Sequence, residues 1–286
     1  MNKIRFSALL LAALSGSLFA QTLVTVNGEA IDSSVIDSQV KIMAANQQVR
    51  DSAELRQYLT EDQVVRTAVA QEAKRLKLDQ SAEYRKALET ARAEAKKSGA
   101  DKQAGFKTEW AVFESELLGQ AYAAYIAAQA PVAEADVKAA YQQFADHYKG
   151  SDEVLLGEIV TKTQAEAQKA VAELKAKKGF ADVFKRYSLD EQRKQSQELF
   201  VPVPLKDLQQ SAPPVYAAVK DLKKGGVSAP VAAGQVFSVF YVNDRRALQV
   251  PTYEQLKGEI AQSLQAQRID QAVGSLLQKA KIQPAK

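Results

Sequence analysis

Most of the chain follows a helical period of apolar and polar positions, and only a few short stretches have the patterns of β-strands. The apolar run at residues 155–161 predicts a strand. Apolar positions spaced three or four apart predict helices at 165–178 and 180–187 and a helical turn at 215–222. Two further strands close this region. The order of elements over 155–246 therefore predicts a small α+β domain of about 90 residues.

The sequence on both sides of this region is predicted to be mainly helical. Alternation over residues 23–26, followed by the Asn27-Gly28 turn signal, predicts a short hairpin. Thr60 and Gln63 fit a capping box, which predicts that a helix begins near Thr60. Helical spacing predicts further helices at 82–97, 106–129, 134–148 and from 253 to about 281.

Helices in water depend on packing, so the flanking helices need an apolar partner. The simplest solution is that the N-terminal helices pack against the C-terminal helix. This predicts one helical domain that the α+β domain interrupts. We expect the N-terminal helical domain at residues 21–150, the α+β domain at 151–247, and a C-terminal helix at 248–286 that packs on the first domain.

The first 20 residues have the features of a secretion signal. A short basic segment at 1–5 precedes an apolar segment that ends in small residues, and cleavage is predicted near Ala20. The apolar segment is shorter than the ~20 residues that span a bilayer, so no stable membrane anchor is expected after cleavage. We expect the mature protein to be exported to the periplasm.

Composition narrows the chemistry that the chain can perform. Basic and acidic residues are mixed along the helices and leave a net charge of only +4, so a nucleic-acid partner is not expected. The chain has no cysteine, which excludes disulfides and thiolate catalysis. Its one histidine, His147, excludes sites that need two imidazoles and is expected to be solvated. No metal or other cofactor is expected.

The order and spacing of several short motifs resemble a parvulin-type (PpiC, rotamase) peptidyl-prolyl cis-trans isomerase domain. The motifs are Thr-Gln-Ala-Glu-Ala at 163–167, Gly-Phe-Ala-Asp-Val-Phe at 179–184, Tyr-Ser-Leu-Asp at 187–190, Leu-Lys-Lys-Gly-Gly-Val-Ser-Ala-Pro-Val at 222–231 and Asn-Asp-Arg-Arg at 243–246. With Val-Thr-Val-Asn-Gly at 24–28, the resemblance extends over nearly the whole mature chain to the SurA/PrsA class of exported foldases.

This resemblance implies a parvulin-like small β-sheet with helices, inserted in a mainly α-helical chaperone domain. It also implies an isomerase that assists the folding of secreted or outer-membrane proteins and binds unfolded or proline-containing polypeptides, with a homodimer left open. The alternative is a periplasmic holdase that has lost catalysis and uses the parvulin-like domain to bind peptides. The chain lacks the two histidines usual at the family's site, which favours the holdase, whereas Asp190 and the overall framework keep the isomerase open.

The candidate catalytic residues occupy the positions that the resemblance assigns to the site. Glu158 stands where the family carries a histidine in its first strand. The second histidine falls at Ser238, or at Val236 in the other register of the closing strand. Asp190 lies where parvulins carry cysteine or aspartate. Each residue also has a structural interpretation: Asp190 as a helix or loop cap, Glu158 as a water-facing strand residue and Ser238 as an ordinary strand residue.

Substrate binding is expected to need an apolar pocket for the proline ring and hydrogen bonds that strengthen as the amide loses its resonance. The rotation barrier that such a site must lower is about 18–20 kcal/mol. We expect Phe200, Val215 and Phe237 to contact the substrate, although the two phenylalanines are also typical core residues. The family's pocket pair falls near Ser211 and Val215.

Overall fold

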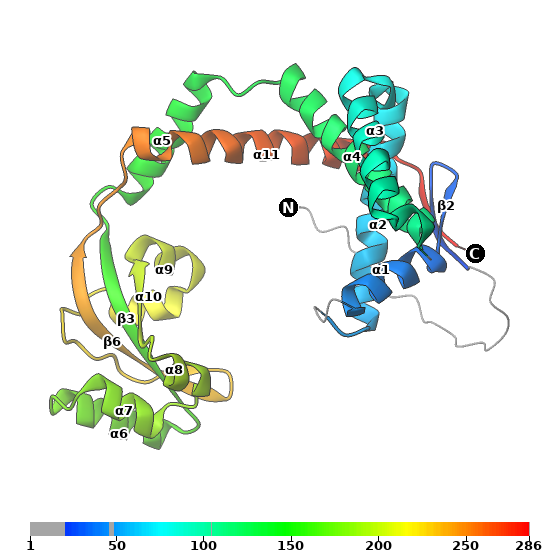
Figure 1. Cartoon of the computed structure of the whole chain (residues 1–286). Coiled ribbons are helices and arrows are strands. Elements are labelled where there is room, and N and C mark those ends of the chain that lie inside the picture. The colour runs from blue at the N-terminus through cyan, green and yellow to red at the C-terminus, as the bar shows by residue number, and fades with distance from the viewer. Residues whose placement is uncertain (1–20, 46–48, 104, 286) are drawn as a thin grey trace. The chain divides into compact units, whose positions relative to one another are not determined.

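The computed structural model describes residues 21–45, 49–103 and 105–285 (Figure 1). The predicted signal peptide and its cleavage site lie outside these residues. The described residues divide into two compact units, of which the second is Ala133–Gln262 and the first contains the described residues up to Val132 and from Ser263 onward. The predicted boundaries after residues 150 and 247 both fall inside the second unit.

The first unit contains a three-stranded antiparallel sheet in the order β2-β1-β7 (Figure 1). Strands β1 (Thr22–Val26) and β2 (Glu29–Asp32) form the predicted hairpin, whose turn residues Asn27 and Gly28 both have positive φ angles. Strand β7 (Ile282–Pro284) was not predicted. It pairs with β1, and Lys281 just before it exchanges hydrogen bonds with Asn27.

Helices form the rest of the first unit. They are α1 (Ser33–Ala45), α2 (Ala53–Arg75), α3 (Ala82–Ser98) and α4 (Phe106–Gln129), with short 3₁₀ turns at Leu78–Gln80 and Ala100–Lys102. The helices predicted at 82–97 and 106–129 are confirmed. One core cluster joins β1 and α2 to the end of α11 (Tyr253–Lys279), through Val24, Val26, Val64, Ala68, Leu276 and Leu277.

The predicted start of α2 near Thr60 is wrong. The helix begins seven residues earlier, where the Ser52 hydroxyl accepts a hydrogen bond from the Leu55 backbone N–H. The Thr60 hydroxyl instead donates to the carbonyl oxygen of Arg56, one turn back within the helix. Residues 53–59 contain strong helix formers, so they extend the helix through the apparent capping box.

The second unit contains a four-stranded antiparallel sheet in the order β4-β3-β6-β5. The strands are β3 (Asp152–Thr161), β4 (Phe200–Pro204), β5 (Val231–Ala233) and β6 (Val236–Ala247). The helices are α5 (Glu134–Tyr148), α6 (Gln164–Lys175), α7 (Phe180–Tyr187), α8 (Glu191–Ser196), α9 (Leu205–Ser211) and α10 (Pro213–Val219). The predicted α+β class is confirmed; β4, α8 and α9 were not predicted.

Helix α5 and the start of α11 both lie in the second unit, where they contact one another. The rings of Tyr141 and Tyr253 meet edge to face with their centroids 5.5 Å apart. The Tyr141 hydroxyl also donates a hydrogen bond of 3.1 Å to the carbonyl oxygen of Pro251. Within the described residues, no helix combines the length and the apolar character needed to cross a bilayer.

Each face of the four-stranded sheet has its own apolar core. Helices α6 and α7 cover one face, where Ile159 and Val239 are fully buried. Helices α9 and α10 cover the other face, where Val154, Phe240 and Val242 are buried. Side chains alternate between the two faces of a strand. The faces of these buried residues therefore give the face of every neighbouring residue on the same strand.

Candidate functional site

Strands β3 and β6 bring Glu158 and Ser238 together on the α9/α10 face of the sheet. Glu158 pairs with Phe240. Ser238 lies two residues before Phe240 on β6, so its side chain is on the same face of the sheet. The buried Ser238 hydroxyl donates a hydrogen bond of 2.7 Å to Glu158 Oε1. Val236 instead pairs with Ala233 at the start of β6, so the register with Ser238 is the one that reaches Glu158.

Asp190 caps the short helix α8, as one of its sequence interpretations predicted. Its Oδ1 accepts a hydrogen bond of 2.9 Å from the Arg193 backbone N–H. The loop before it is attached to β3, because the Leu189 N–H donates to the Val160 carbonyl oxygen and the Val160 N–H donates to the Ser188 hydroxyl. These contacts hold the Asp190 carboxylate beside the strand that carries Glu158.

Arg193 connects the two carboxylates. Its Nη1 lies 3.9 Å from Glu158 Oε2 and its Nε lies 3.4 Å from Asp190 Oδ2. The three charged side chains are each about one-third exposed, so a peptide in solution can reach them. Ser238, Glu158, Arg193 and Asp190 therefore form a continuous polar network, called here the site network.

Sequence reasoning predicted three members of the site network and missed Arg193. The signal that could have found it is local: Arg193 follows the capping Asp190 by three residues, so both lie on the same side of α8. Nothing in the sequence pattern places Glu158 beside this helix, because that contact depends on the tertiary fold.

The predicted substrate contacts do not share one face of the sheet. Val215 packs on the α9/α10 face, which also carries Glu158. Phe200 and Phe237 pack on the opposite face, where the Phe200 ring lies 4.9 Å from the ring of Phe180. The two phenylalanines therefore do not line the same face of the sheet as Val215. They are partly buried core residues of the α6/α7 face.

Two exposed apolar side chains lie near the site network instead. Leu189 precedes Asp190 and is 51% exposed. Val201 on β4 is 43% exposed. It pairs with Leu156, which lies two residues before Glu158 and therefore on the same face of β3. Exposed large side chains next to a polar network can supply apolar contacts to a bound peptide.

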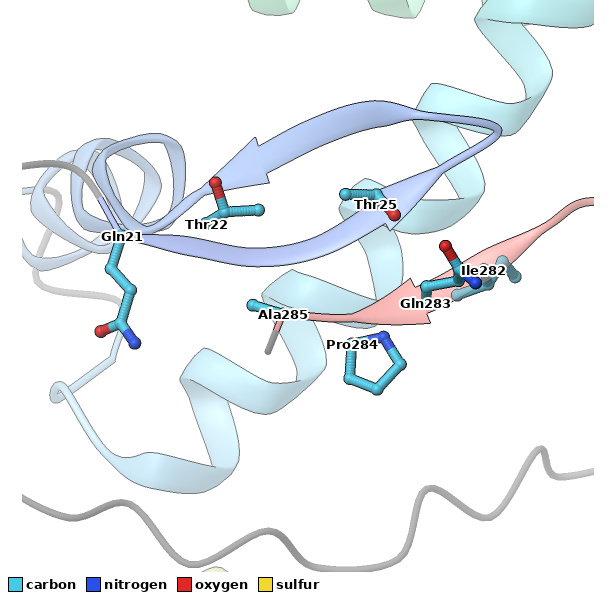
Figure 2. A pocket seen from close by; sticks show the side chains of 7 residues that line it. All are labelled: Gln21, Thr22, Thr25, Ile282, Gln283, Pro284 and Ala285. Carbon is cyan, nitrogen blue, oxygen red and sulfur yellow. The ribbon is translucent and has the colours of Figure 1, made fainter.

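The structure also contains two open hollows that lie away from the site network. One, of about 600 Å³, lies in the first unit beside β1 and β7 and is lined by Gln21, Thr22, Thr25, Ile282, Gln283, Pro284 and Ala285 (Figure 2). The other, in the second unit, is lined by Lys178, Gly179, Asp182, Lys185 and Arg186. The first has no titratable side chain in its lining, and neither contains a residue of the site network.

The site network can act by charge and hydrogen bonding. It offers two carboxylates, a guanidinium and a hydroxyl, and no thiol or imidazole. Among the residues that the structure describes, no group of three or more histidine, cysteine or acidic side chains could hold a metal ion. An arrangement of this kind suits a reaction that only redistributes charge within the substrate.

Comparison with known proteins agrees with the fold of the second unit. The family model of the PPIC-type PPIase domain matches residues 132–258. A probable parvulin-type peptidyl-prolyl cis-trans isomerase of Bordetella pertussis is 28% identical over 267 residues, which cover 93% of this chain and 93% of the relative. A parvulin-like PPIase of Rickettsia prowazekii is 25% identical over 140 residues, about half of each chain.

Solved structures similar to the chain include a peptidylprolyl isomerase, PrsA, of Bacillus cereus. It is 21% identical with a TM-score of 0.39, and the match covers 93% of this chain and 95% of that one. A second is from work on two SurA-like chaperones of Campylobacter jejuni, PEB4 and Cj1289. It is 21% identical with a TM-score of 0.34, and the match covers 93% of this chain and all of that one.

Proposed function

Because residues 132–258 match the PPIC-type PPIase domain, we propose that the chain is a parvulin-type isomerase that catalyses prolyl cis–trans isomerisation in exported polypeptides. Secreted or outer-membrane proteins would be its substrates. Uncatalysed prolyl isomerisation takes tens of seconds or longer and can limit folding. An exported foldase of this kind would remove that delay.

The observation that carries the proposal is the convergence of the site network. Glu158 and Ser238 are 80 residues apart in the chain, yet they share a hydrogen bond of 2.7 Å. Asp190 comes from a separate loop and reaches Glu158 through Arg193. The residues that the sequence resemblance assigns to the site, Glu158, Asp190 and Ser238, thus share one network.

The two carboxylates supply a physical reason for catalysis. Amide resonance places partial negative charge on the carbonyl oxygen and gives the C–N bond its double-bond character. A carbonyl oxygen held near Glu158 and Asp190 would make that charge separation less favourable. The planar amide would then be destabilised relative to the twisted transition state, in which resonance is lost, and differential stabilisation of this kind lowers the barrier.

Exchange spectroscopy of a short Ala-Pro peptide by NMR tests the proposal. We expect the purified chain to accelerate cis–trans exchange, and Asp190→Asn to reduce the acceleration at least tenfold. Asparagine is a matched variant because it caps a helix as well as aspartate but carries no charge. No acceleration by the wild-type chain at high concentration would refute the proposed activity. Equal acceleration by Asp190→Asn would refute only the role of Asp190.

A second function, holding of unfolded polypeptides, is supported by helix α4. Of its 24 residues only Leu118 and Tyr122 are buried, although most of the helix is apolar. Phe106, Trp110 and Phe113 form a run of ring contacts with centroids 5.3–5.5 Å apart and remain partly exposed. Apolar side chains that remain partly exposed in a group form a surface that suits an apolar client.

Aggregation of an unfolded outer-membrane protein tests the holding function separately. We expect wild type and Asp190→Asn to suppress aggregation equally. Replacing Phe106, Trp110 and Phe113 together by serine should weaken the suppression while leaving peptide isomerisation unchanged. Undiminished suppression by the folded triple variant would show that α4 does not hold clients.

A further inference from the structure

The guanidinium of Arg193 lies between two carboxylates without donating a hydrogen bond to either. Its separations of 3.4 Å from Asp190 and 3.9 Å from Glu158 exceed the 2.7–3.2 Å of N–H···O hydrogen bonds. Within the described part of the chain, its side-chain N–H groups make these two ion pairs and no hydrogen bond. Its N–H donors are therefore not committed to hydrogen bonds and can bind a ligand.

We propose that Arg193 is a catalytic residue that donates a hydrogen bond to the imide nitrogen of the substrate's prolyl bond. This role rests on the proposed isomerase function. In the planar amide the nitrogen lone pair is delocalised, so the nitrogen is a poor acceptor. In the twisted transition state the lone pair is localised on nitrogen, so a donor placed there binds the transition state more strongly than the ground state.

The surroundings of Arg193 determine where its guanidinium lies. The Arg193 backbone belongs to the helix that Asp190 caps, so its position relative to that carboxylate is set locally. Glu158, its other partner, is held by the hydrogen bond from the buried Ser238 hydroxyl. Each carboxylate that faces the guanidinium is thus itself held by a hydrogen bond, which is the support that a preorganised donor needs.

The site network offers groups of opposite charge to the carbonyl oxygen and to the nitrogen of the amide. The negative groups, Glu158 and Asp190, suit the carbonyl-oxygen side, where they oppose resonance. The positive donor suits the nitrogen side, where it stabilises the localised lone pair. One guanidinium between two carboxylates therefore provides both effects within one small site.

The test compares Arg193 variants in the Ala-Pro exchange measurement, with peptide binding followed separately by chemical-shift titration. Arg193→Met keeps the apolar stem and removes every donor, and we expect it to reduce the acceleration at least tenfold. Peptide affinity should change less than threefold, because the hydrogen bond forms only in the transition state. Arg193→Lys keeps a charged donor and should retain part of the acceleration.

Lys194→Met is the matched control, because it removes a neighbouring charge on the same helix. Lys194 pairs with Glu191, at 2.8 Å, and with neither carboxylate of the site network. We expect it to behave as wild type. Acceleration by Arg193→Met equal to wild type, or an equal loss in Lys194→Met, would overturn the proposal while the isomerase function stands. No acceleration by wild type would overturn both.

Discussion

At the residue scale, Asp190 combines a carboxylate of the site network with the cap of α8, and stability measurements can separate the two roles. Asp190→Ala should lower the free energy of unfolding by about 1 kcal/mol, because the Arg193 backbone N–H loses its acceptor. Asp190→Asn should change it by only a few tenths of that amount. Urea unfolding of both variants checks the prediction, and an equal loss in both would contradict the capping role.

The carboxylate of Glu173 on α6 should give the second unit a specific acid sensitivity. Partial burial raises the pKa of Glu173, but hydrogen bonds from Lys178 and Tyr187 and the charge of Arg186 outweigh burial, so the pKa lies below its ordinary 4.5. A lowered folded-state pKa contributes stability that is present above the unfolded value and lost as pH falls through the folded value.

Glu173→Gln removes this contribution, so its unfolding free energy should fall below that of wild type at pH 7. The difference between the two proteins should shrink as the pH falls below 4.5 and through the folded-state pKa. Urea unfolding at a series of pH values measures it. A difference that stays constant over this range would show that the Glu173 carboxylate does not contribute in its charged form.

The residue scale also shows why sequence patterns found only part of the site. The positions of Glu158, Asp190 and Ser238 followed from the order of motifs, and the structure brings all three together. Phe200 and Phe237 were expected to contact the substrate, and they lie on the face of the sheet opposite Glu158. Which face of a sheet a partly buried aromatic side chain occupies depends on strand register, and the short strand β4 was not predicted.

At the element scale, the edge strand β4 is protected by proline. Pro202 and Pro204 alternate with Val201 and Val203, so two residues of this edge strand have no N–H to donate. This arrangement blocks the addition of another strand at the edge. Strand β7 is protected in the same way. The Ala285 N–H donates to the carbonyl oxygen of Leu23, so the nitrogen of Pro284 lies on the side of the strand away from β1.

Replacing both β4 prolines by valine should therefore promote association. The Pro202→Val/Pro204→Val variant restores two donors on an exposed edge and adds β-forming side chains. We expect concentration-dependent assembly in sedimentation or light scattering beyond that of wild type. The lysine counterpart, Pro202→Lys/Pro204→Lys, restores the same donors with repelling charges and should behave as wild type. Identical behaviour of the valine variant and wild type would show that the prolines do not protect this edge.

Helical periodicity located most helices well, and its errors have physical causes. Helices α4 and α5 match their predicted ranges because Pro131 separates them and the acidic Glu134 begins the second. Helix α8 has six residues and β7 has three, so each is too short to show a period. Strand β7 is specified by its pairing with β1 some 250 residues away, which no local pattern records.

At the scale of the whole molecule, the first unit is closed by residues from the end of the described chain. Strand β7 pairs with β1, and Leu276 and Leu277 of α11 pack against Val24 and Val26. Ending the chain after Ala280 removes this strand and the bonds between Lys281 and Asn27. We expect that truncation to lower the melting temperature of the first unit and to speed amide exchange in β1.

Ending the chain after Pro284 is the graded control, because it removes only the hydrogen bond from Ala285 to Leu23. Its amide exchange in β1 should stay close to that of wild type. Amides of β3 and β6 should exchange at wild-type rates in both truncations, because these strands belong to the other unit. Unchanged exchange in β1 after the longer truncation would show that β7 does not stabilise the first unit.

We propose that Glu158 and Asp190, linked by Arg193, make the second unit an isomerase. The most direct measurement is the cis–trans exchange rate of an Ala-Pro peptide with wild type and with the Glu158→Gln/Asp190→Asn variant, both shown to be folded by their amide spectra. We predict strong acceleration by wild type and little or none by the double variant. No acceleration by wild type, or equal acceleration by both proteins, would contradict the claim.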